Sequence, residues 1–198
     1  MDKTLSYYED NAETFIKRTV SVDFSMVADR FASILPKEAH ILDYGCGSGR
    51  DTKYFLDKGF LVDAIDGSKE LCRYAGKYTG IPVKCMLFQE LEEHEKYDGI
   101  WACSSILHVS KKELPHIFAR MIAAVKSEGV IYTSFKYGDF EGERNGRYFS
   151  DFTSESFGEF LMQFPELHII EEWISGDVRP ERGEEKWLNI ILERSTIR

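Results

Sequence analysis

The sequence predicts an α/β fold in which a mostly parallel sheet lies between two layers of helices. From residue 39 to residue 135, short apolar segments alternate with amphipathic ones, as expected for parallel strands joined by crossover helices. The last two apolar segments, 167–174 and 187–192, are joined by a connection too short for a crossover helix and should form an antiparallel hairpin. The chain has 198 residues with no linker or internal repeat, so one domain is expected.

The individual elements follow from the same periodicities. Residues 1–38 are expected to be helical, because apolar residues such as Phe24, Val27 and Phe31 recur at helical spacing until Pro36 ends the run. The strands are the short apolar segments 39–43, 60–65, 83–88, 98–102, 130–135, 167–174 and 187–192. The remaining helices are the amphipathic segments 51–58, 69–78, 111–125 and 154–163. This order predicts a Rossmann-like three-layer sandwich: a seven-stranded sheet with helices on both faces and a final antiparallel hairpin.

The composition excludes several classes of protein. The chain has 25 basic and 34 acidic residues, and a net charge of −9 repels nucleic-acid phosphates. No apolar run approaches the roughly 20 residues of a membrane span, and the first ten residues lack the basic start and apolar centre of a signal peptide. The four cysteines form no CxxC pair, which favours reduced thiols over a disulfide frame or a zinc site. We therefore expect a cytoplasmic protein that binds neither nucleic acid nor membranes and needs no metal; its oligomeric state is left open.

A glycine loop between the first predicted strand and the next helix is the strongest functional signal. Residues 41–49 read Ile-Leu-Asp-Tyr-Gly-Cys-Gly-Ser-Gly, so three glycines alternate after Asp43. Glycines permit a tight turn and let a ligand approach the backbone. Asp66 ends the second predicted strand, 21 positions after Gly45 (66 − 45), where an acid can accept both hydroxyls of a ribose. Asp66 fits either a nicotinamide dinucleotide or another adenosine cofactor, but Arg50 stands where the dinucleotide fingerprint GxGxxG has its third glycine.

This order of acid, GxGxG, helix, strand and acid resembles motif I of the class I S-adenosylmethionine-dependent methyltransferases. In that family the glycine loop lies against the amino-acid part of the cofactor, and the motif acid holds its ammonium directly or through water. The charge of the cofactor fits this motif, because carboxylates and carbonyls bind an ammonium and a sulfonium better than N–H donors do. Residues 97–109, Tyr-Asp-Gly-Ile-Trp-Ala-Cys-Ser-Ser-Ile-Leu-His-Val, resemble motif IV of the small-molecule members. The resemblance covers residues 39–135 and is closest to the small tellurite-resistance-like group.

The resemblance implies S-adenosylmethionine as cofactor and S-adenosylhomocysteine as product. It implies cofactor contacts from the glycine loop, the second strand, the segment after the third strand and the end of the fourth: Asp43, Gly45, Cys46, Gly47, Asp66, Gly67, Ser68, Phe88, Gln89, Glu90, Cys103 and Ser104. Related proteins fold an N-terminal helix over the cofactor, so residues 1–38 are predicted to be a lid that contributes Tyr8 and Arg18. Plain core packing by the aromatic residues of this segment is the alternative.

The acceptor side is predicted from the edge of the sheet. Ligands of open α/β sheets bind beyond the carboxyl ends of the strands, where two late loops leave the sheet. These loops carry five cations that could select an anionic acceptor, unless they are merely solvated: Lys136, Arg144, Arg147, Arg179 and Arg182. His108 is the candidate general base, since an ordinary pKa near 6.5 suits proton removal; a structural role in its loop is the alternative.

The sequence thus divides into a lid (1–38), a cofactor-binding core (39–135) and a region of acceptor-side loops with the final hairpin (136–198), all within one methyltransferase domain. The predicted reaction is in-line transfer of a methyl group to a small acceptor, which the cations of the two late loops could select as an anion, with no covalent nucleophile or metal. Two alternatives stay open. The first is a non-catalytic module that binds S-adenosylmethionine, and the second is an NAD-dependent oxidoreductase.

Overall fold

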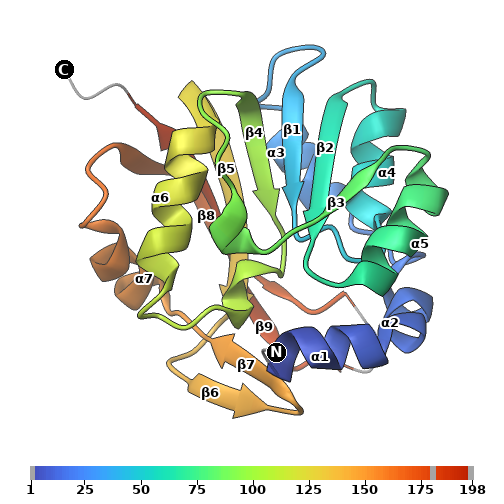
Figure 1. The fold of residues 1–198 in the computed structure, drawn as a ribbon. Helices are drawn as coiled ribbons and strands as arrows, with labels where there is room; N and C mark the ends of the chain where they lie inside the picture. Colours follow the sequence, from blue (N-terminus) through green and yellow to red (C-terminus); the bar gives the residue numbers. More distant parts are fainter. Residues whose placement is uncertain (1–2, 179–181, 196–198) are drawn as a thin grey trace.

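Seven strands form one sheet in the computed structural model, which describes residues 3–178 and 182–195 (Figure 1). The strand order is β3-β2-β1-β4-β5-β9-β8, with the first five parallel and β9 antiparallel to both of its neighbours. The strands are β1 (His40–Tyr44), β2 (Leu61–Asp66), β3 (Val83–Cys85), β4 (Tyr97–Ala102), β5 (Val125–Lys136), β8 (Leu167–Gly176) and β9 (Lys186–Arg194). The predicted sheet, including its final hairpin, is confirmed.

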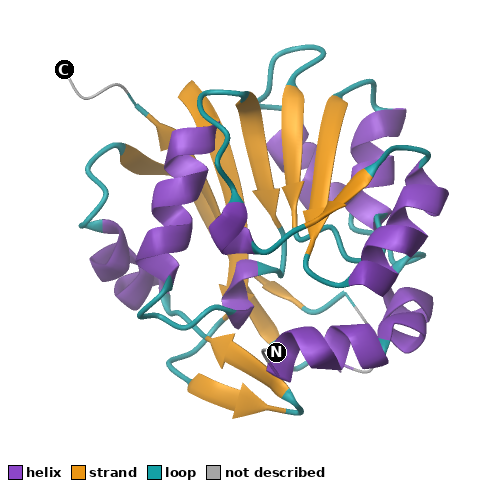
Figure 2. Cartoon of the chain, in the orientation of Figure 1, coloured by secondary structure: helices purple, strands orange, loops and turns teal. Residues whose placement is uncertain are grey.

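Helices cover both faces of the sheet, as Figure 2 shows. One face packs against α3 (Ser25–Ala32), α4 (Arg50–Asp57) and α5 (Lys69–Thr79), and the other against α6 (Leu114–Ala124) and α7 (Ser154–Leu161). Side chains alternate along each strand, so Ile41 of β1 joins the first layer and Leu42 joins the second. The three-layer sandwich is confirmed. None of the described helices is long and apolar enough to cross a membrane.

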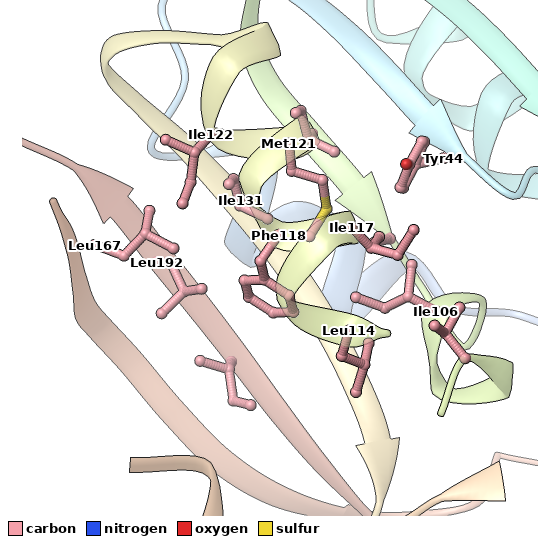
Figure 3. Packing of buried hydrophobic residues seen from close by; sticks show 14 of the residues in the cluster. Tyr44, Ile106, Leu114, Ile117, Phe118, Met121, Ile122, Ile131, Leu167 and Leu192 are labelled. Atoms are coloured by element: carbon pink, nitrogen blue, oxygen red, sulfur yellow. The ribbon is translucent and has the colours of Figure 1, made fainter. Parts of the chain in front are cut away.

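The side of α6 that faces the sheet shows how the helical periodicity becomes a core (Figure 3). Its apolar residues recur every three or four positions and are fully or nearly fully buried against β5 and β9: Leu114, Ile117, Phe118, Met121 and Ile122. Burial of each such side chain contributes about 1.5–3 kcal/mol.

Some elements have other ends than expected, as in β5, which begins at Val125 and not at residue 130, and two local predictions were wrong. The segment 83–88 is a strand only to Cys85 and then turns into a 3-10 helix, Phe88–Glu90, because the Glu90 carboxylate accepts the Leu87 N–H at 2.7 Å. The loop after β5 contains a second, two-stranded sheet, β6 (Glu141–Arg144) and β7 (Arg147–Ser150). Its turn is Asn145-Gly146, with φ of +51° and +78°, a hairpin signal that was present in the sequence.

Two short helices, α1 (Lys3–Asp10) and α2 (Ala12–Thr19), lie across the carboxyl ends of the parallel strands (Figure 1). Thr4 Oγ1 of α1 accepts the Tyr148 N–H of β7 at 2.9 Å, and Ser68 Oγ donates to Glu9 at 2.6 Å. The N-terminal segment is therefore tied both to the small hairpin and to the start of α5.

Candidate active site

A cavity of about 580 Å³ lies at the carboxyl ends of β1, β2, β4 and β5, under α1 and α2. The glycine loop, the ends of β2 and β4, the hairpin strand β7 and the beginning of β9 all contribute to its walls. Its position is the one that an open α/β sheet predicts for a ligand.

The glycine loop and Asp66 form one hydrogen-bonded unit. The N–H groups of Gly45 and Cys46 both donate to the Ile65 carbonyl, at 3.0 and 2.9 Å. Asp66 Oδ2 accepts the Gly47 N–H at 2.9 Å, and Asp66 Oδ1 accepts the Ser68 N–H at the same distance. Both glycines and Asp66 line the cavity, so the acid at the end of β2 and the loop after β1 face one space.

Asp43 is a buried carboxyl with no ion pair within 4.0 Å among the described residues, although the charge of Arg50 acts on it. It lies at the end of β1, and its Oδ2 accepts a hydrogen bond of 2.5 Å from Thr52 Oγ1. Burial raises the pKa of Asp43 to about 8, and the nearby charge of Asp51 adds to the effect. A ligand ammonium in the cavity would favour the ionised carboxylate, so this wall fits the ammonium of an amino-acid group.

Binding of S-adenosylhomocysteine is therefore expected to tighten as Asp43 loses its proton. Below the pKa of Asp43 the affinity should rise by up to about tenfold per pH unit, because the bound state releases one proton. The rise should level off above a pH of about 8. Calorimetry from pH 6 to pH 8.5 measures it, and Asp43→Asn should bind weakly with little dependence on pH. A steep, unchanged profile in that variant would assign the proton to another group.

The adenine side of the predicted cofactor site is apolar. Phe88 and Gln89 line the cavity together with Met86 and Leu87. The Phe88 ring lies 4.8 Å from the Tyr44 ring, and Tyr44 donates its hydroxyl proton to the Phe88 carbonyl at 2.6 Å. These contacts fix the segment after β3 although it is not a strand.

A hydrogen-bonded pair joins the N-terminal helix to the loop after β4. The Tyr8 hydroxyl and His108 Nε2 are 2.8 Å apart, and His108 Nδ1 lies 2.6 Å from the Tyr148 carbonyl. A carbonyl only accepts, so Nδ1 carries the proton and Nε2 accepts from Tyr8. Burial, together with the smaller effect of the Arg147 charge, lowers the pKa of His108 to about 4. His108 is therefore neutral at physiological pH, and both of its nitrogens have partners.

This depressed pKa predicts a loss of stability in acid. The unfolded chain binds a proton at His108 below pH 6.5, while the folded chain resists protonation until about pH 4. Stability contributed by neutral His108 is thus complete above pH 6.5 and falls, by up to about 3 kcal/mol, as the pH drops to 4. Urea unfolding at pH 7 and pH 4.5 should show a smaller difference for His108→Gln than for the unchanged protein. Equal differences would mean that His108 titrates normally.

Cations predicted on the acceptor side differ in what they face. Lys136, Arg147 and Arg182 line the cavity. Lys136 pairs with Glu185 and with Asp177 Oδ2 at 3.5 Å, and its Nζ lies 3.9 Å from the centre of the Trp187 ring. Arg182 lies 3.8 Å from Glu185. Arg179 lies outside the described residues.

Four predicted contact residues do not reach the cavity. Arg18 is exposed on the outer side of α2. Ser68 is buried, with its hydroxyl shared between Glu9 and the Leu71 N–H at the start of α5. Glu90 is used by the Leu87 N–H. Arg144 pairs with Asp151 at 2.6 Å and lies against the Phe140 and Phe149 rings.

Other cavity residues were missed by the sequence reasoning. Arg50 and Asp51 follow the glycine loop and form a two-point ion pair of 2.7 and 2.8 Å, in which Asp51 also accepts from Trp101 at 2.9 Å. The position beside the loop could have indicated these two. No pattern in the sequence indicated the cavity walls from distant segments: Thr4, Glu113, Phe149, Trp187 and Asn189.

The remaining predicted contacts lie on the walls, namely Gly67, Cys103 and Ser104 with Cys46. All four cysteines are free. Burial raises the pKa of the Cys46 thiol, and that of the Cys103 thiol to about 12. Neither thiol is activated as a nucleophile.

Comparison with known proteins also points to a methyltransferase. Residues 41–129 match the model of a methyltransferase domain. A Bacillus subtilis (strain 168) protein named as a methyltransferase, YqeM, is 28% identical over 116 residues, which are 53% of this chain and 47% of that protein. The chain thus spans about half the length of the curated relatives that it matches.

Solved structures share the fold over nearly the whole chain. The 1,6-didemethyltoxoflavin-N1-methyltransferase of Burkholderia thailandensis has a TM-score of 0.77 at 22% identity, with 97% of this chain and 85% of that chain covered. A TehB-like methyltransferase of Corynebacterium glutamicum has a TM-score of 0.74 at 18% identity, with 96% and 99% covered. The domain match over residues 41–129 and the relatives named as methyltransferases support an S-adenosylmethionine-dependent methyltransferase, and the solved structures share its fold.

Proposed function

We propose that the protein transfers a methyl group from S-adenosylmethionine to a small, anionic acceptor, leaving S-adenosylhomocysteine. The observation that carries the proposal is the wall formed by Asp43, the glycine loop and Asp66, which faces one cavity of about 580 Å³. A solved relative of the same fold holds S-adenosylhomocysteine together with its small acceptor, 1,6-didemethyltoxoflavin, and this supports the proposal for a cavity that also extends beyond the cofactor residues. A cytoplasmic location and a single domain over residues 1–198 are part of it.

The residues present fit the cofactor group by group. Asp43 offers a buried carboxyl to the ammonium, Asp66 offers two carboxylate oxygens to the ribose, and the Phe88 side chain offers an apolar surface to the adenine. S-adenosylmethionine supplies a methyl group on a sulfonium, which is already an activated leaving group. The protein's part is to hold acceptor and donor in line and to exclude water, and orientation alone contributes about 7–11 kcal/mol to such a reaction.

The N-terminal helices supply the cover. Tyr8 reaches the cavity from α1, and Phe15 of α2 lies 3.0 Å from the place where a Cβ on Gly47 would be. We propose that α1 and α2 form the lid predicted for residues 1–38 and shield the glycine loop from solvent. Tyr8 is the member of this segment best placed to meet the cofactor.

His108 is proposed to act through Tyr8. Its Nε2 holds the Tyr8 hydroxyl, so it positions that side chain on the cavity wall. For an acceptor that must lose a proton, the Nε2 lone pair becomes available only when Tyr8 gives up this bond. An acceptor that is already anionic needs no base, and positioning is then sufficient.

Thermal unfolding with S-adenosylhomocysteine and, in parallel, with NAD tests the cofactor. A ligand at 100 times its dissociation constant adds about 2.7 kcal/mol, or roughly 5–10 °C for a chain of this size. A rise with S-adenosylhomocysteine alone supports the proposal, and transfer of label from methyl-tritiated cofactor to small acids would then identify the acceptor. A rise only with NAD would redirect the search to hydride transfer, and binding without transfer would favour a non-catalytic module.

A further inference from the structure

We propose, on the basis of the methyltransferase function above, that Arg147 binds an oxyanion of the acceptor, and that this acceptor is a small carboxylic or phosphoric acid with an apolar body. The site is the part of the cavity wall formed by Arg147, Tyr8, His108 and Phe149. In this proposal, one of the five cations predicted on the acceptor side contacts the oxyanion.

Charge pairing separates Arg147 from the other cations on the wall. Among the described residues, Arg50, Lys136 and Arg182 line the cavity with a carboxylate within 4.0 Å, from Asp51, Asp177 and Glu185. Arg147 lines it with none. A guanidinium that is mostly removed from water without a counter-charge calls for an anion.

The hydrogen bonds of Arg147 are also incomplete. A guanidinium has five N–H donors in a fixed plane. Within the described part of the chain, Arg147 makes one hydrogen bond, from Nη1 to the Tyr8 hydroxyl at 3.3 Å, and its Nε is buried without a partner. Nη1 points to Tyr8, so Nε and Nη2, which share the other edge of the plane, are left for a two-point contact with an oxyanion. Reaching Nε requires a small movement of the side chain, because Nε itself is covered.

Aromatic rings hold this guanidinium in place. Its central carbon lies 4.7 Å from the centre of the Tyr7 ring and 5.1 Å from that of Phe149. These rings pack against the guanidinium and lower the local dielectric, which strengthens an ion pair with a ligand. Leu107, Val109 and Phe149 continue the wall with apolar surface, which suits an acceptor whose body is hydrophobic.

An anion at this place would also change His108. The Arg147 charge helps to hold the pKa of the neighbouring imidazole down, and a bound carboxylate would offset that charge. Binding can therefore be observed as a rise in the pKa of His108, a signal that a purely structural Arg147 would not give.

The test uses the full chain saturated with S-adenosylhomocysteine and three probes: benzoate, phenyl phosphate and the neutral benzamide. Calorimetry measures affinity, and NMR titration of the His108 ring measures its pKa with and without each probe. We expect at least one of the two acids to bind about tenfold or more tightly than benzamide and to raise the pKa of His108. Whichever of the two acids binds more tightly indicates whether the acceptor carries a carboxylate or a phosphate.

Two variants and a matched control locate the contact. Arg147→Met keeps the packing length and should lose the preference for the acid over benzamide, and Arg147→Lys should keep part of it. Arg144→Met changes another ring-stacked arginine of the same hairpin, outside the cavity, and should keep the full preference.

The outcomes separate this inference from the proposed function. Unchanged binding of S-adenosylhomocysteine by Arg147→Met shows that the variant is folded. If the unchanged protein binds both acids no better than benzamide, or if Arg147→Met keeps the preference, the inference is wrong while the cofactor assignment stands. Failure to bind S-adenosylhomocysteine at all would instead overturn the proposed function.

Discussion

Asp66→Ala is expected to weaken the binding of S-adenosylhomocysteine by about 100-fold or more. The variant removes both carboxylate oxygens proposed to accept from the ribose, and hydrogen bonds to a charged group are each worth about 1.5–3 kcal/mol. It also frees the N–H groups of Gly47 and Ser68, which Asp66 holds at 2.9 Å. Calorimetric titration measures the loss of affinity directly. The affinity of Asp66→Asn should lie between those of Asp66→Ala and the unchanged protein, because its amide oxygen can still accept a hydrogen bond.

Asp63→Ala is the matched control for this prediction. Asp63 lies on the same strand, three residues earlier, but it pairs with Lys96 at 2.9 Å and does not line the cavity. We expect its loss to leave the affinity within about twofold, since its partners Lys96 and Tyr97 do not line the cavity either. Unchanged affinity in Asp66→Ala, or an equal loss in both variants, would remove Asp66 from the cofactor site.

Gly45→Ala is expected to destabilise the protein by about 2–4 kcal/mol. Gly45 has φ of +92°, and a Cβ there would come within 2.5 Å of the Ser105 Cβ and 3.2 Å of the Phe88 ring. Both the strained backbone and the clash act on the glycine loop, which lines the cavity. Thermal unfolding should show a midpoint lower by roughly 5–15 °C, and cofactor affinity should fall with it.

Gly59→Ala separates the two causes. Gly59 has a similar φ of +89°, but a Cβ there would meet nothing within 4 Å. Its substitution should therefore cost only the backbone term, about 1–2 kcal/mol. The difference between the two variants measures the close approach of Ser105 to the glycine loop. Equal losses would show that the clash relaxes without cost.

The fold could be predicted from the sequence wherever residues close together in the chain decide the structure. Alternating strands and helices, and the final hairpin, follow from periodicities within about ten residues, and the structure confirms them. The end of β3 was mispredicted because the apolar residues Met86 to Phe88 have the composition of a strand, whereas the Glu90 side chain closes a tight turn there. The β6–β7 hairpin was missed because charged residues hid the Asn145-Gly146 signal.

The candidate site also contains residues that the sequence could predict and residues that it could not. Asp43, the glycine loop and Asp66 could be found from the sequence because each lies directly at the end of its own strand, and parallel strands bring their carboxyl ends to one edge. Spacing could not tell that Arg18 points outward or that Glu90 is used by its own turn. These outcomes depend on the rotation of a helix and on one competing hydrogen bond.

The sequence by itself determined the parallel sheet, the position of its ligand-binding edge and the acidic glycine loop, since these rest on short-range patterns. Only the tertiary structure decided which cations have partners. Lys136 and Arg182 meet acids from the β8–β9 connection, Arg144 meets Asp151, and Arg147 meets aromatic rings. All of these carry the same charge in sequence, but the effect of a charge depends on burial and on neighbours from distant segments.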